Sequence, residues 1–472
     1  MGQFKISRMA TLRRSRALVI SPRLWKSRLV FWVGALAIGV ISAGFALAAD
    51  EAQALFFAIT SEGGRAWLPL IITPVGFVAL AWASMVWFPG SQGSGIPQAI
   101  AARHIGIKGD ISKLLSLKLA IGKIVMTVIG LGCGASIGRE GPTVQVAAAI
   151  MLQSASLGGM KHARGLIIAG SAAGVSAAFN TPLAGIVFAI EELSRSYQVR
   201  SNGVVLSAVV LAGVSSLWIL GSYTYFGESN AQVLFPDNAV LVLVCGVVGG
   251  LFGGWFTRAV IYLTRRFRRW RAAAPLRRTL MIAFGAGMIS AVIGVAYGGA
   301  TFGTGYEQAR AAVEGHAAPF SLFIAKLIAT LAATVSGIPG GLFAPSLTVG
   351  ASLGSSIGML LNENIMLAAL LGMAGYFAGV TQAPMTAFVI IFEMTGNHDN
   401  VLPIMAAAML GHGVSRFVAP EPLYHTLSRL FIADALRQRR AMERTPAPET
   451  ETPETEAPAA LEHQTDPSNP KA

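Results

Sequence analysis

Long apolar stretches separated by short polar loops run along most of the chain. One extends from Leu29 to Ala49 and another from about Val240 to Phe256. A spanning helix needs ~20 apolar residues, so runs of this kind predict membrane crossings. Other runs, such as Leu183 to Leu193 and Ile365 to Ala378, are too short for a full crossing. The pattern predicts an all-α polytopic membrane protein that contains partial helices.

Glycine and proline interrupt the apolar stretches at several places. The interruptions occur around Gly93, Gly134 to Pro142, Asn180 to Pro182, Gly337 to Pro345 and Pro384. Non-helical backbone at membrane depth survives only where it is buried in protein or lines a cavity. We therefore expect tilted and broken helices whose ends converge inside the membrane.

The first apolar run allows two interpretations. It ends in Ala46-Leu47-Ala48, which imitates a signal-peptidase site, and it follows eight basic residues with no acid before Asp50. A signal sequence has an apolar region of only ~7–15 residues, and this run is longer. We favour a retained first membrane helix, preceded by a basic cytoplasmic segment at 1–28.

Three blocks of the first half recur in order in the second half. Because the offsets are nearly constant, they indicate a duplication rather than chance matches. Residues 93–99 match 303–309 (303 − 93 = 210), 123–146 match 326–349 (326 − 123 = 203), and 170–191 match 372–393 (372 − 170 = 202).

Charge predicts how the two halves are oriented. A basic cluster precedes the opening apolar run of the first half, whereas eight arginines between Arg258 and Arg278 follow that of the second. Basic loops stay in the cytoplasm, so the halves enter the membrane from opposite faces, as an inverted-topology repeat. We expect both termini in the cytoplasm, membrane repeats at 29–225 and 226–436, and a disordered tail at 437–472 without a folded regulatory domain.

Composition excludes several classes of protein. Of 472 residues, 53% are hydrophobic and 12% are charged, far from a soluble domain. The net charge of +13 could suggest nucleic acid, but the basic residues flank apolar runs, so we expect no nucleic-acid partner. Cys133 and Cys245 have no metal-binding spacing, and no nucleophile set or P-loop is visible. We expect no metal, no cofactor and no enzymatic activity.

The sequence Gly138-Arg139-Glu140-Gly141-Pro142 carries the most informative charge. It puts Glu140 beside a predicted helix N-terminus within an apolar region, where a carboxylate is costly and marks a functional site. A helix N-terminus stabilises an anion through its dipole and its unpaired N–H groups. The site could therefore hold either this carboxylate or a small anion in its place. The alternative is a structural Glu140 paired with Arg139, which we expect to anchor structure.

Four motifs in order resemble the chloride channel/transporter (CLC) family. The resemblance covers about residues 29 to 435 and implies homodimers with one anion pathway in each subunit. The motifs are Gly93-Ser94-Gly95-Ile96-Pro97, Gly138 to Pro142, Gly341-Leu342-Phe343-Ala344-Pro345, and Phe179-Asn180-Thr181-Pro182-Leu183-Ala184-Gly185 followed by Glu191-Glu192.

The resemblance implies roles for individual residues. Ser94, the N–H groups of Leu342 and Phe343, and Tyr424 would line a central chloride site. Ser94 could instead be a helix cap and Tyr424 an interfacial residue, and the third motif could be a close-packed turn. The backbone positions that the motifs supply are Gly93, Gly95, Gly138, Gly141, Gly341 and Pro345.

Two glutamates distinguish the possible mechanisms. By resemblance, Glu140 is a gate shared by chloride and protons, and Glu192 transfers protons from the cytoplasm, although a solvated interfacial carboxylate is the alternative. Glu191 matches Glu393 in the repeat, which favours a structural role for that pair, whereas Met394 stands opposite Glu192. We expect chloride/proton exchange in a bacterial inner membrane. The alternatives are a passive chloride channel and, less favoured, a nitrate or fluoride transporter.

Overall fold

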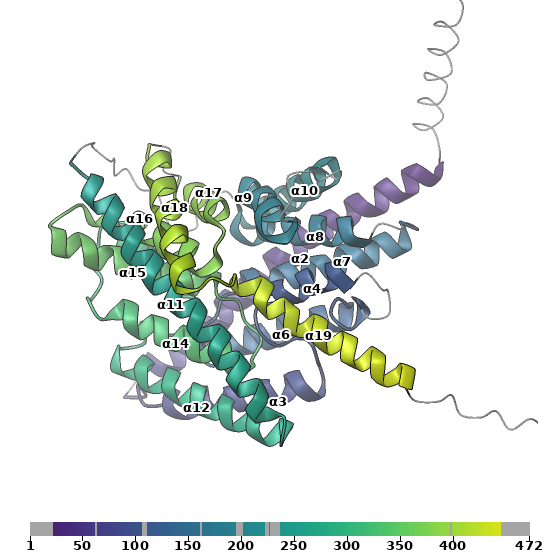
Figure 1. Ribbon diagram of the computed structural model, residues 1–472, viewed down its shortest axis with the longest axis horizontal. Coiled ribbons are helices and arrows are strands. Elements are labelled where there is room, and N and C mark those ends of the chain that lie inside the picture. Colours follow the sequence, from purple (N-terminus) through teal and green to yellow (C-terminus); the bar gives the residue numbers. More distant parts are fainter. Residues whose placement is uncertain are drawn as a thin grey trace, which may run out of the picture. The chain divides into compact units, whose positions relative to one another are not determined.

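The computed structural model describes the chain from Pro22 to Arg444 with several gaps, and its residues form helices throughout (Figure 1). The part up to Ile432 is one compact unit, and a second unit begins at Ala433. Within the described part, seven helices are long and apolar enough to cross a membrane. The predicted all-α polytopic class is confirmed. The described residues are 22–61, 64–105, 111–160, 163–194, 202–221, 226, 237–396 and 399–444.

The helices fall into two successive series with matching order. The first comprises α2 (Pro22–Ser61), α3 (Pro69–Val86), α4 (Ile96–Ile105), α6 (Leu117–Gly132), α7 (Glu140–Leu157), α8 (Ala163–Phe179), α9 (Pro182–Phe188), the π-helical turn η1 (Ala189–Ser194) and α10 (Asn202–Leu220). The second comprises α11 (Ala239–Arg271), α12 (Pro275–Ala296), α13 (Tyr306–Val313), α14 (Leu322–Ser336), α15 (Phe343–Leu361), α16 (Ile365–Thr381), α17 (Pro384–Thr395) and α18 (Val401–Val418), followed by α19 (Leu423–Arg444).

Packing follows the repeat. Helix α7 packs on α8 as α15 packs on α16, and α10 packs on α2 and α8 as α18 packs on α11 and α16. The equivalent helices α3 and α12 pack on each other, and so do α9 and α17 (Figure 1). Contacts between equivalent elements are what an approximate twofold axis requires. The predicted inverted-topology repeat of tilted and broken helices is confirmed.

Two buried lysines repeat the same contact in each half. The Lys123 ammonium on α6 donates to the carbonyls of Ser91 and Gly93. The Lys326 ammonium on α14 donates to those of Thr301, at 3.0 Å, and Gly303, at 2.8 Å. Both side chains are fully buried, so each ammonium has lost the water that would hydrate it. The carbonyls take the place of that water as hydrogen-bond acceptors. Each lysine therefore holds the glycine-rich loop that precedes α4 or α13.

Two glutamates cap each other's half of the repeat. The Glu191 carboxylate accepts from the N–H groups of Met385 and Thr386 at 3.1 and 2.7 Å, at the start of α17. Glu393 accepts from Leu183 and Ala184 at 3.0 and 2.7 Å, at the start of α9. A carboxylate at a helix N-terminus satisfies orphan donors and matches the helix dipole. The structural role expected for this pair is confirmed.

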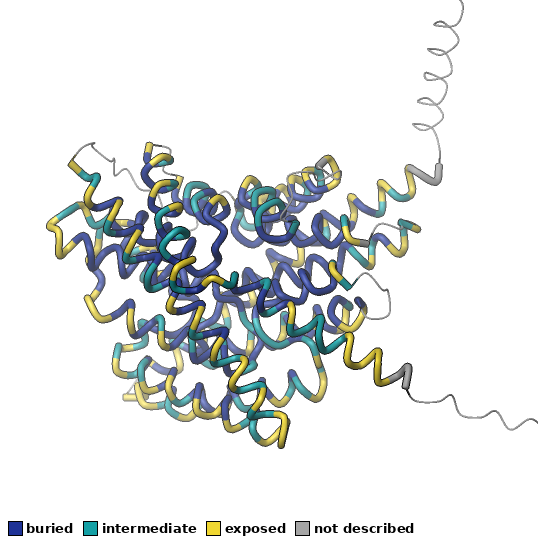
Figure 2. Tube along the Cα trace, viewed as in Figure 1, coloured by how far each residue is buried: buried dark blue, intermediate teal, exposed yellow. Residues whose placement is uncertain are grey.

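The helix breaks are local features of the backbone. Asn180 and Gln382, each two residues before the start of α9 or α17, both have φ of 58° and so end the preceding helices in the left-handed region. Glycines allow close packing: a Cβ on Gly372 of α16 would lie 2.4 Å from the Gly350 oxygen of α15. Figure 2 shows buried residues throughout α7, α8, α15 and α16, whereas α12 has an exposed face.

Some predicted boundaries differ from the observed ones. Helix α2 passes beyond Ala49 and through Asp50 to Ser61, because good helix formers continue past the apolar run. In α11, the helix likewise continues beyond Phe256 to Arg271. Helix α19 extends to Arg444, so residues 437–444 of the predicted disordered tail are helical. The rest of the tail and residues 1–21 of the basic segment lie outside the described residues, and so do 222–225 and 227–236, on either side of Phe226 at the 225/226 boundary.

Replacing Glu393 with alanine should lower the stability of the protein. The change leaves two N–H groups at the start of α9 without acceptors, that of the exposed Leu183 and that of the buried Ala184, which costs about 1–3 kcal/mol. Thermal unfolding in detergent measures the effect, with Glu51→Ala on the exposed face of α2 as the control. Equal melting temperatures for the two variants would contradict the capping role.

Candidate functional site

Three glycine-rich loops meet at the centre of the first unit. Gly138 and Gly341, which are equivalent in the repeat, each donate to the other's carbonyl at 2.7 Å. The N–H of Gly93 donates to Ile338 at 3.1 Å, and Gly340 donates back to Gly93 at 3.2 Å. The loops before α4, α7 and α15 are therefore joined by short antiparallel and parallel backbone pairings.

Only glycine allows this approach. A Cβ on Gly141 would lie 2.9 Å from the carbonyl oxygen of Ser94, and one on Gly341 would lie 3.0 Å from the carbonyl oxygen of Gly138. Gly95 also has a φ of 100°, which other residues rarely adopt. The starts of three helices consequently lie together. The first N–H groups of a helix have no acceptor within it, so this junction is electropositive and suited to an anion.

Glu140 lies at this junction as the first residue of α7. It is fully buried, and its side chain folds back over Gly138, where a Cβ would lie only 2.3 Å from Oε2. The same Cβ would lie 3.2 Å from Pro345 Cδ, at the start of α15. The carboxylate therefore lies between the starts of two helices, as the sequence predicts for a tethered anion.

Ser94 is buried beside the same junction. Its hydroxyl accepts from the N–H of Ile96 at 3.3 Å, a long contact in the first turn of α4. Its Cβ would lie 3.2 Å from a Cβ on Gly141, so it faces the start of α7. A hydroxyl has two lone pairs and one hydrogen. The weak capping contact therefore leaves its hydrogen available for an anion.

Phe343, the first residue of α15, is enclosed by aromatic rings. The rings of Phe179, Phe188, Phe377 and Tyr424 lie 4.9 to 6.1 Å from it, centroid to centroid, and they come from α8, α9, α16 and α19. Such contacts add stability beyond area burial and restrict the ring. The start of α15, with the buried Leu342 before it, is therefore held rigidly.

Tyr424 enters this aromatic cluster from α19. The side chain is fully buried, and its hydroxyl has no hydrogen-bond partner among the described residues. An unsatisfied buried hydroxyl costs about 1–3 kcal/mol, so such a group usually meets a ligand or water. The carboxylates of Glu140 and Glu192 both act electrostatically on this phenol. Tyr424 is therefore part of the cluster and not an interfacial residue.

Glu191 and Glu192 point in different directions, as predicted. Glu191 caps α17, whereas Glu192 is 2% exposed and its Oε1 lies 3.7 Å from His425 Nε2. The same ring nitrogen lies 2.9 Å from the Glu192 carbonyl oxygen. A solvated Glu192 is excluded. His425 was not predicted as a site residue, and its position directly after Tyr424 was the only available signal.

Arg139 turns away from the junction. Its guanidinium donates to the Ala46 carbonyl at 2.7 Å and pairs with Asp50 at 2.8 Å, both on α2. The side chain is 6% exposed. These contacts tie the start of α7 to the first helix, as expected for an anchoring residue.

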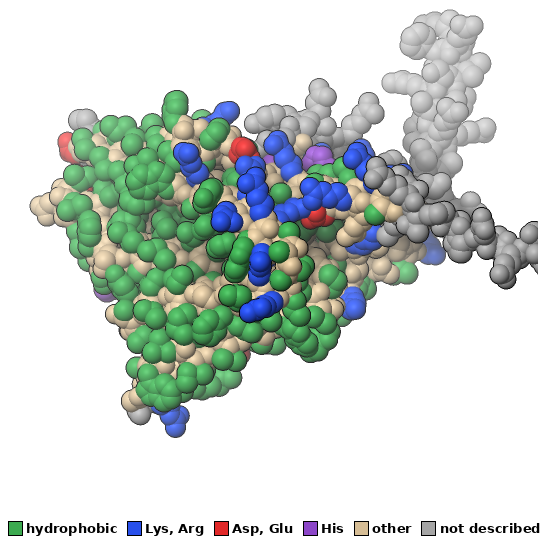
Figure 3. All heavy atoms as spheres, turned by 60° about the horizontal axis from the view of Figure 1, so that its bottom comes forward, with side chains coloured by type: hydrophobic (Ala, Val, Ile, Leu, Met, Phe, Trp, Pro, Cys, Tyr) green, Lys and Arg blue, Asp and Glu red, His purple; other side chains and the backbone are tan. Residues whose placement is uncertain are grey.

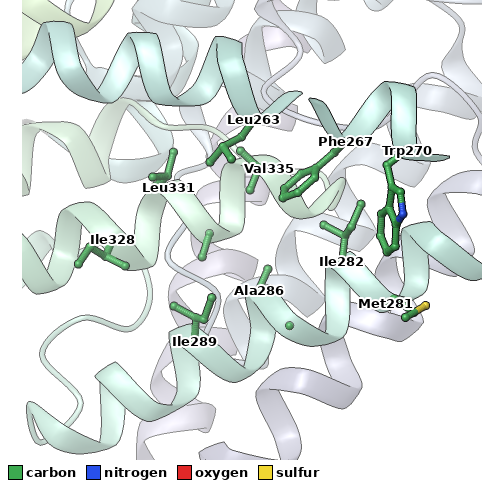
Figure 4. A pocket seen from close by; sticks show the side chains of 12 residues that line it. Leu263, Phe267, Trp270, Met281, Ile282, Ala286, Ile289, Ile328, Leu331 and Val335 are labelled. Carbon is green, nitrogen blue, oxygen red and sulfur yellow. The ribbon is translucent and has the colours of Figure 1, made fainter. Parts of the chain in front are cut away.

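The described residues contain no group of His, Cys, Asp and Glu that could hold a metal. Both cysteines are free thiols; Cys245 is buried and Cys133 partly so. An apolar groove of about 410 Å³ lies between α11, α12 and α14 (Figure 4), lined by residues such as Leu263, Trp270 and Ile289. Apart from the indole N–H of Trp270, the side chains that line it are apolar, so it suits a lipid chain and not an ion.

Comparison with known proteins agrees with this geometry. The family model described as "Voltage gated chloride channel" matches residues 75–416. The H(+)/Cl(-) exchange transporter ClcA of Citrobacter koseri is 29% identical over 76% of this chain and 79% of its own length. The ClcA of Salmonella arizonae is 28% identical over 94% of this chain and 98% of its own.

Solved structures share the fold. A slow cyanobacterial Cl-/H+ antiporter has a TM-score of 0.75 at 25% identity, covering 89% of this chain and 100% of the antiporter chain. A CLC-type fluoride/proton antiporter has a TM-score of 0.71 at 24% identity, covering 86% and 98%. The fold and the central junction define a polytopic CLC-type membrane protein. The chain belongs to the voltage-gated chloride channel family.

Replacing Arg139 with alanine should destabilise the protein. The change removes the charged donor that hydrogen-bonds the Ala46 carbonyl and pairs with Asp50, and so breaks the contact between α2 and α7. The expected cost is about 2–3 kcal/mol. Thermal unfolding measures this loss, with Arg65→Ala, an exposed arginine, as the control. A melting temperature equal to that of the control would show that Arg139 is not an anchor.

Proposed function

We propose that this chain exchanges chloride for protons across a bacterial inner membrane, as a homodimer with one anion pathway in each subunit. The observation that carries the proposal is the meeting of three helix starts around the buried Glu140 carboxylate. Relatives named as H(+)/Cl(-) exchange transporters support it. Both chain termini would face the cytoplasm.

Surface charge supports this orientation. Figure 3 shows wide apolar areas on one face, with Lys and Arg side chains gathered in a band. The end of α11 and the start of α12 are basic. Helix α11 carries six arginines from Arg258 to Arg271, and two more lie at the start of α12. Because basic loops stay in the cytoplasm, the end of α11 and the start of α12 would lie on that side.

Backbone donors explain how chloride could bind and leave. A full Lys or Arg charge in contact with a dehydrated anion would hold it too tightly for throughput, whereas N–H groups and hydroxyls bind it weakly enough for release. In this chain, Lys123 and Arg139 are committed to carbonyls and to Asp50. The anion would instead meet Ser94, Tyr424 and the N–H groups of Leu342 and Phe343.

Glu140 would link the two ions. Ionised, its carboxylate occupies the electropositive junction in place of an anion. Protonated, it loses the attraction of the helix start, so it can leave the junction and let chloride in. Chloride movement would therefore require a proton on Glu140, which makes this residue the gate of both pathways.

Glu192 would supply those protons from the cytoplasmic side. It is almost completely buried, and both it and Glu140 act electrostatically on the Tyr424 phenol. A buried carboxylate beside a substrate path is suited to carry a proton. This carboxylate favours exchange over the alternative, a passive chloride channel, which needs no second proton-transfer group.

Glu140→Ala should leave chloride flux but abolish proton uptake driven by a chloride gradient, because the shared acid is gone. Liposomes with simultaneous chloride and pH recording measure both. Glu51→Ala on α2 serves as the control and should retain coupled exchange. Persistent proton pumping in Glu140→Ala would refute its role, and a wild-type reversal potential insensitive to a pH gradient would favour the channel.

Tyr424→Phe should weaken chloride binding about tenfold, because the anion loses one charge-assisted hydrogen bond. Without chloride, stability should not fall, since the hydroxyl has no partner to lose among the described residues and its removal relieves an unsatisfied polar group. Calorimetric titration with chloride measures the affinity. Tyr376→Phe is a matched control, since that hydroxyl is also buried without a described partner. Equal affinities in both variants would remove Tyr424 from the site.

A further inference from the structure

We propose that His425 is the group that passes protons to Glu192, an inference that rests on the proposed exchange function. The histidine occupies the position after Tyr424, in the first turn of α19. It would connect cytoplasmic water to the buried carboxylate, so that protons reach Glu192 through an imidazole.

The geometry places one ring nitrogen against two oxygens of the same residue. Nε2 of His425 lies 2.9 Å from the Glu192 carbonyl oxygen and 3.7 Å from its carboxylate Oε1. The His425 side chain is 14% exposed, whereas that of Glu192 is 2% exposed. The imidazole therefore reaches solvent, and the carboxylate reaches the imidazole.

The turn that carries Glu192 is held in place by other donors. In the π-helical η1, the Leu193 and Ser194 carbonyls accept from the Arg103 guanidinium of α4. The carbonyl of Glu192, the residue before Leu193, lies within hydrogen-bond distance of His425 Nε2. These contacts keep the Glu192 backbone still, so a rotation of its side chain alone can bring Oε1 within hydrogen-bond distance of Nε2.

The proton transfer balances without any other reactant. Neutral His425 carries its proton on Nε2, which faces the two Glu192 oxygens. Nδ1 takes a proton from cytoplasmic water, and the imidazolium then breaks its Nε2–H bond as an O–H bond forms on the Glu192 carboxylate. The histidine is left neutral with its proton on Nδ1, and exchange with water returns it to the first tautomer.

Charges around His425 act in both directions. Glu192 favours the imidazolium, whereas the Arg103 guanidinium, which contacts the neighbouring Leu193 carbonyl of η1, disfavours it. Arg164 in turn acts electrostatically on Arg103. Arg429 lies one turn further along α19. In the loop before α19, a hydrogen bond from Arg265 lowers the pKa of Glu421, and the Arg265 charge balances that of the carboxylate. The imidazole therefore lies between opposing charges, in a setting that suits a side chain that takes up and releases a proton.

His425→Gln tests the relay, because glutamine can still donate to the Glu192 carbonyl but cannot pass a proton. Coupled exchange in liposomes should fall about tenfold or more, and the rise in rate on acidifying the internal buffer should disappear. Imidazole added to the internal buffer should restore rate to His425→Ala, a readout that a structural role would not move.

His104→Gln is the matched control, since that histidine also contacts a carbonyl, of Ile100 at 2.8 Å, but is exposed on α4. It should keep the wild-type rate and pH profile. A wild-type rate and pH profile in His425→Gln, or no rescue of a slow His425→Ala by imidazole, would overturn the relay. If wild-type protein moves chloride without protons, the proposed exchange itself fails, whatever His425 does.

Discussion

The structure depends on backbone contact between helix starts inside an apolar environment. Gly138 and Gly341 exchange two hydrogen bonds of 2.7 Å. A Cβ on Gly341 would lie 3.0 Å from the Gly138 carbonyl oxygen, and one on Gly138 would lie 2.3 Å from the Glu140 carboxylate. This contact directs the unpaired N–H groups of α7 and α15 toward one region. In low dielectric those groups attract negative charge strongly, so the region must hold a carboxylate or an anion.

The scaffold is symmetric, but the chemistry placed on it is not. Lys123 and Lys326 make the same contacts at equivalent positions, and so do Glu191 and Glu393. These paired residues hold loops and cap helices. By contrast, Glu140 is equivalent to Phe343 at the start of its helix. The position held by an acid in one half is therefore held in the other half by an aromatic residue surrounded by rings.

Asymmetry also separates the two neighbouring glutamates of η1. Glu191 has an equivalent glutamate, Glu393, and caps a helix. The residue equivalent to Glu192 is Met394, and Glu192 instead contacts His425. Helix α19, which follows the second series, brings both Tyr424 and His425 to the site. An element outside the twofold repeat thus supplies the groups that the repeat itself lacks.

By itself, the sequence determined the class, the duplication and the residues of the junction, because glycine-rich motifs, apolar runs and an intramembrane acid are local signals. It also indicated which glutamate pair was structural, through the offset between Glu191 and Glu393. Only the tertiary structure decided how far α2 and α19 extend, that Arg139 reaches Asp50, and that His425 reaches Glu192. Those contacts join residues far apart in the chain, and their geometry is set by the packing of whole helices, which no local pattern encodes.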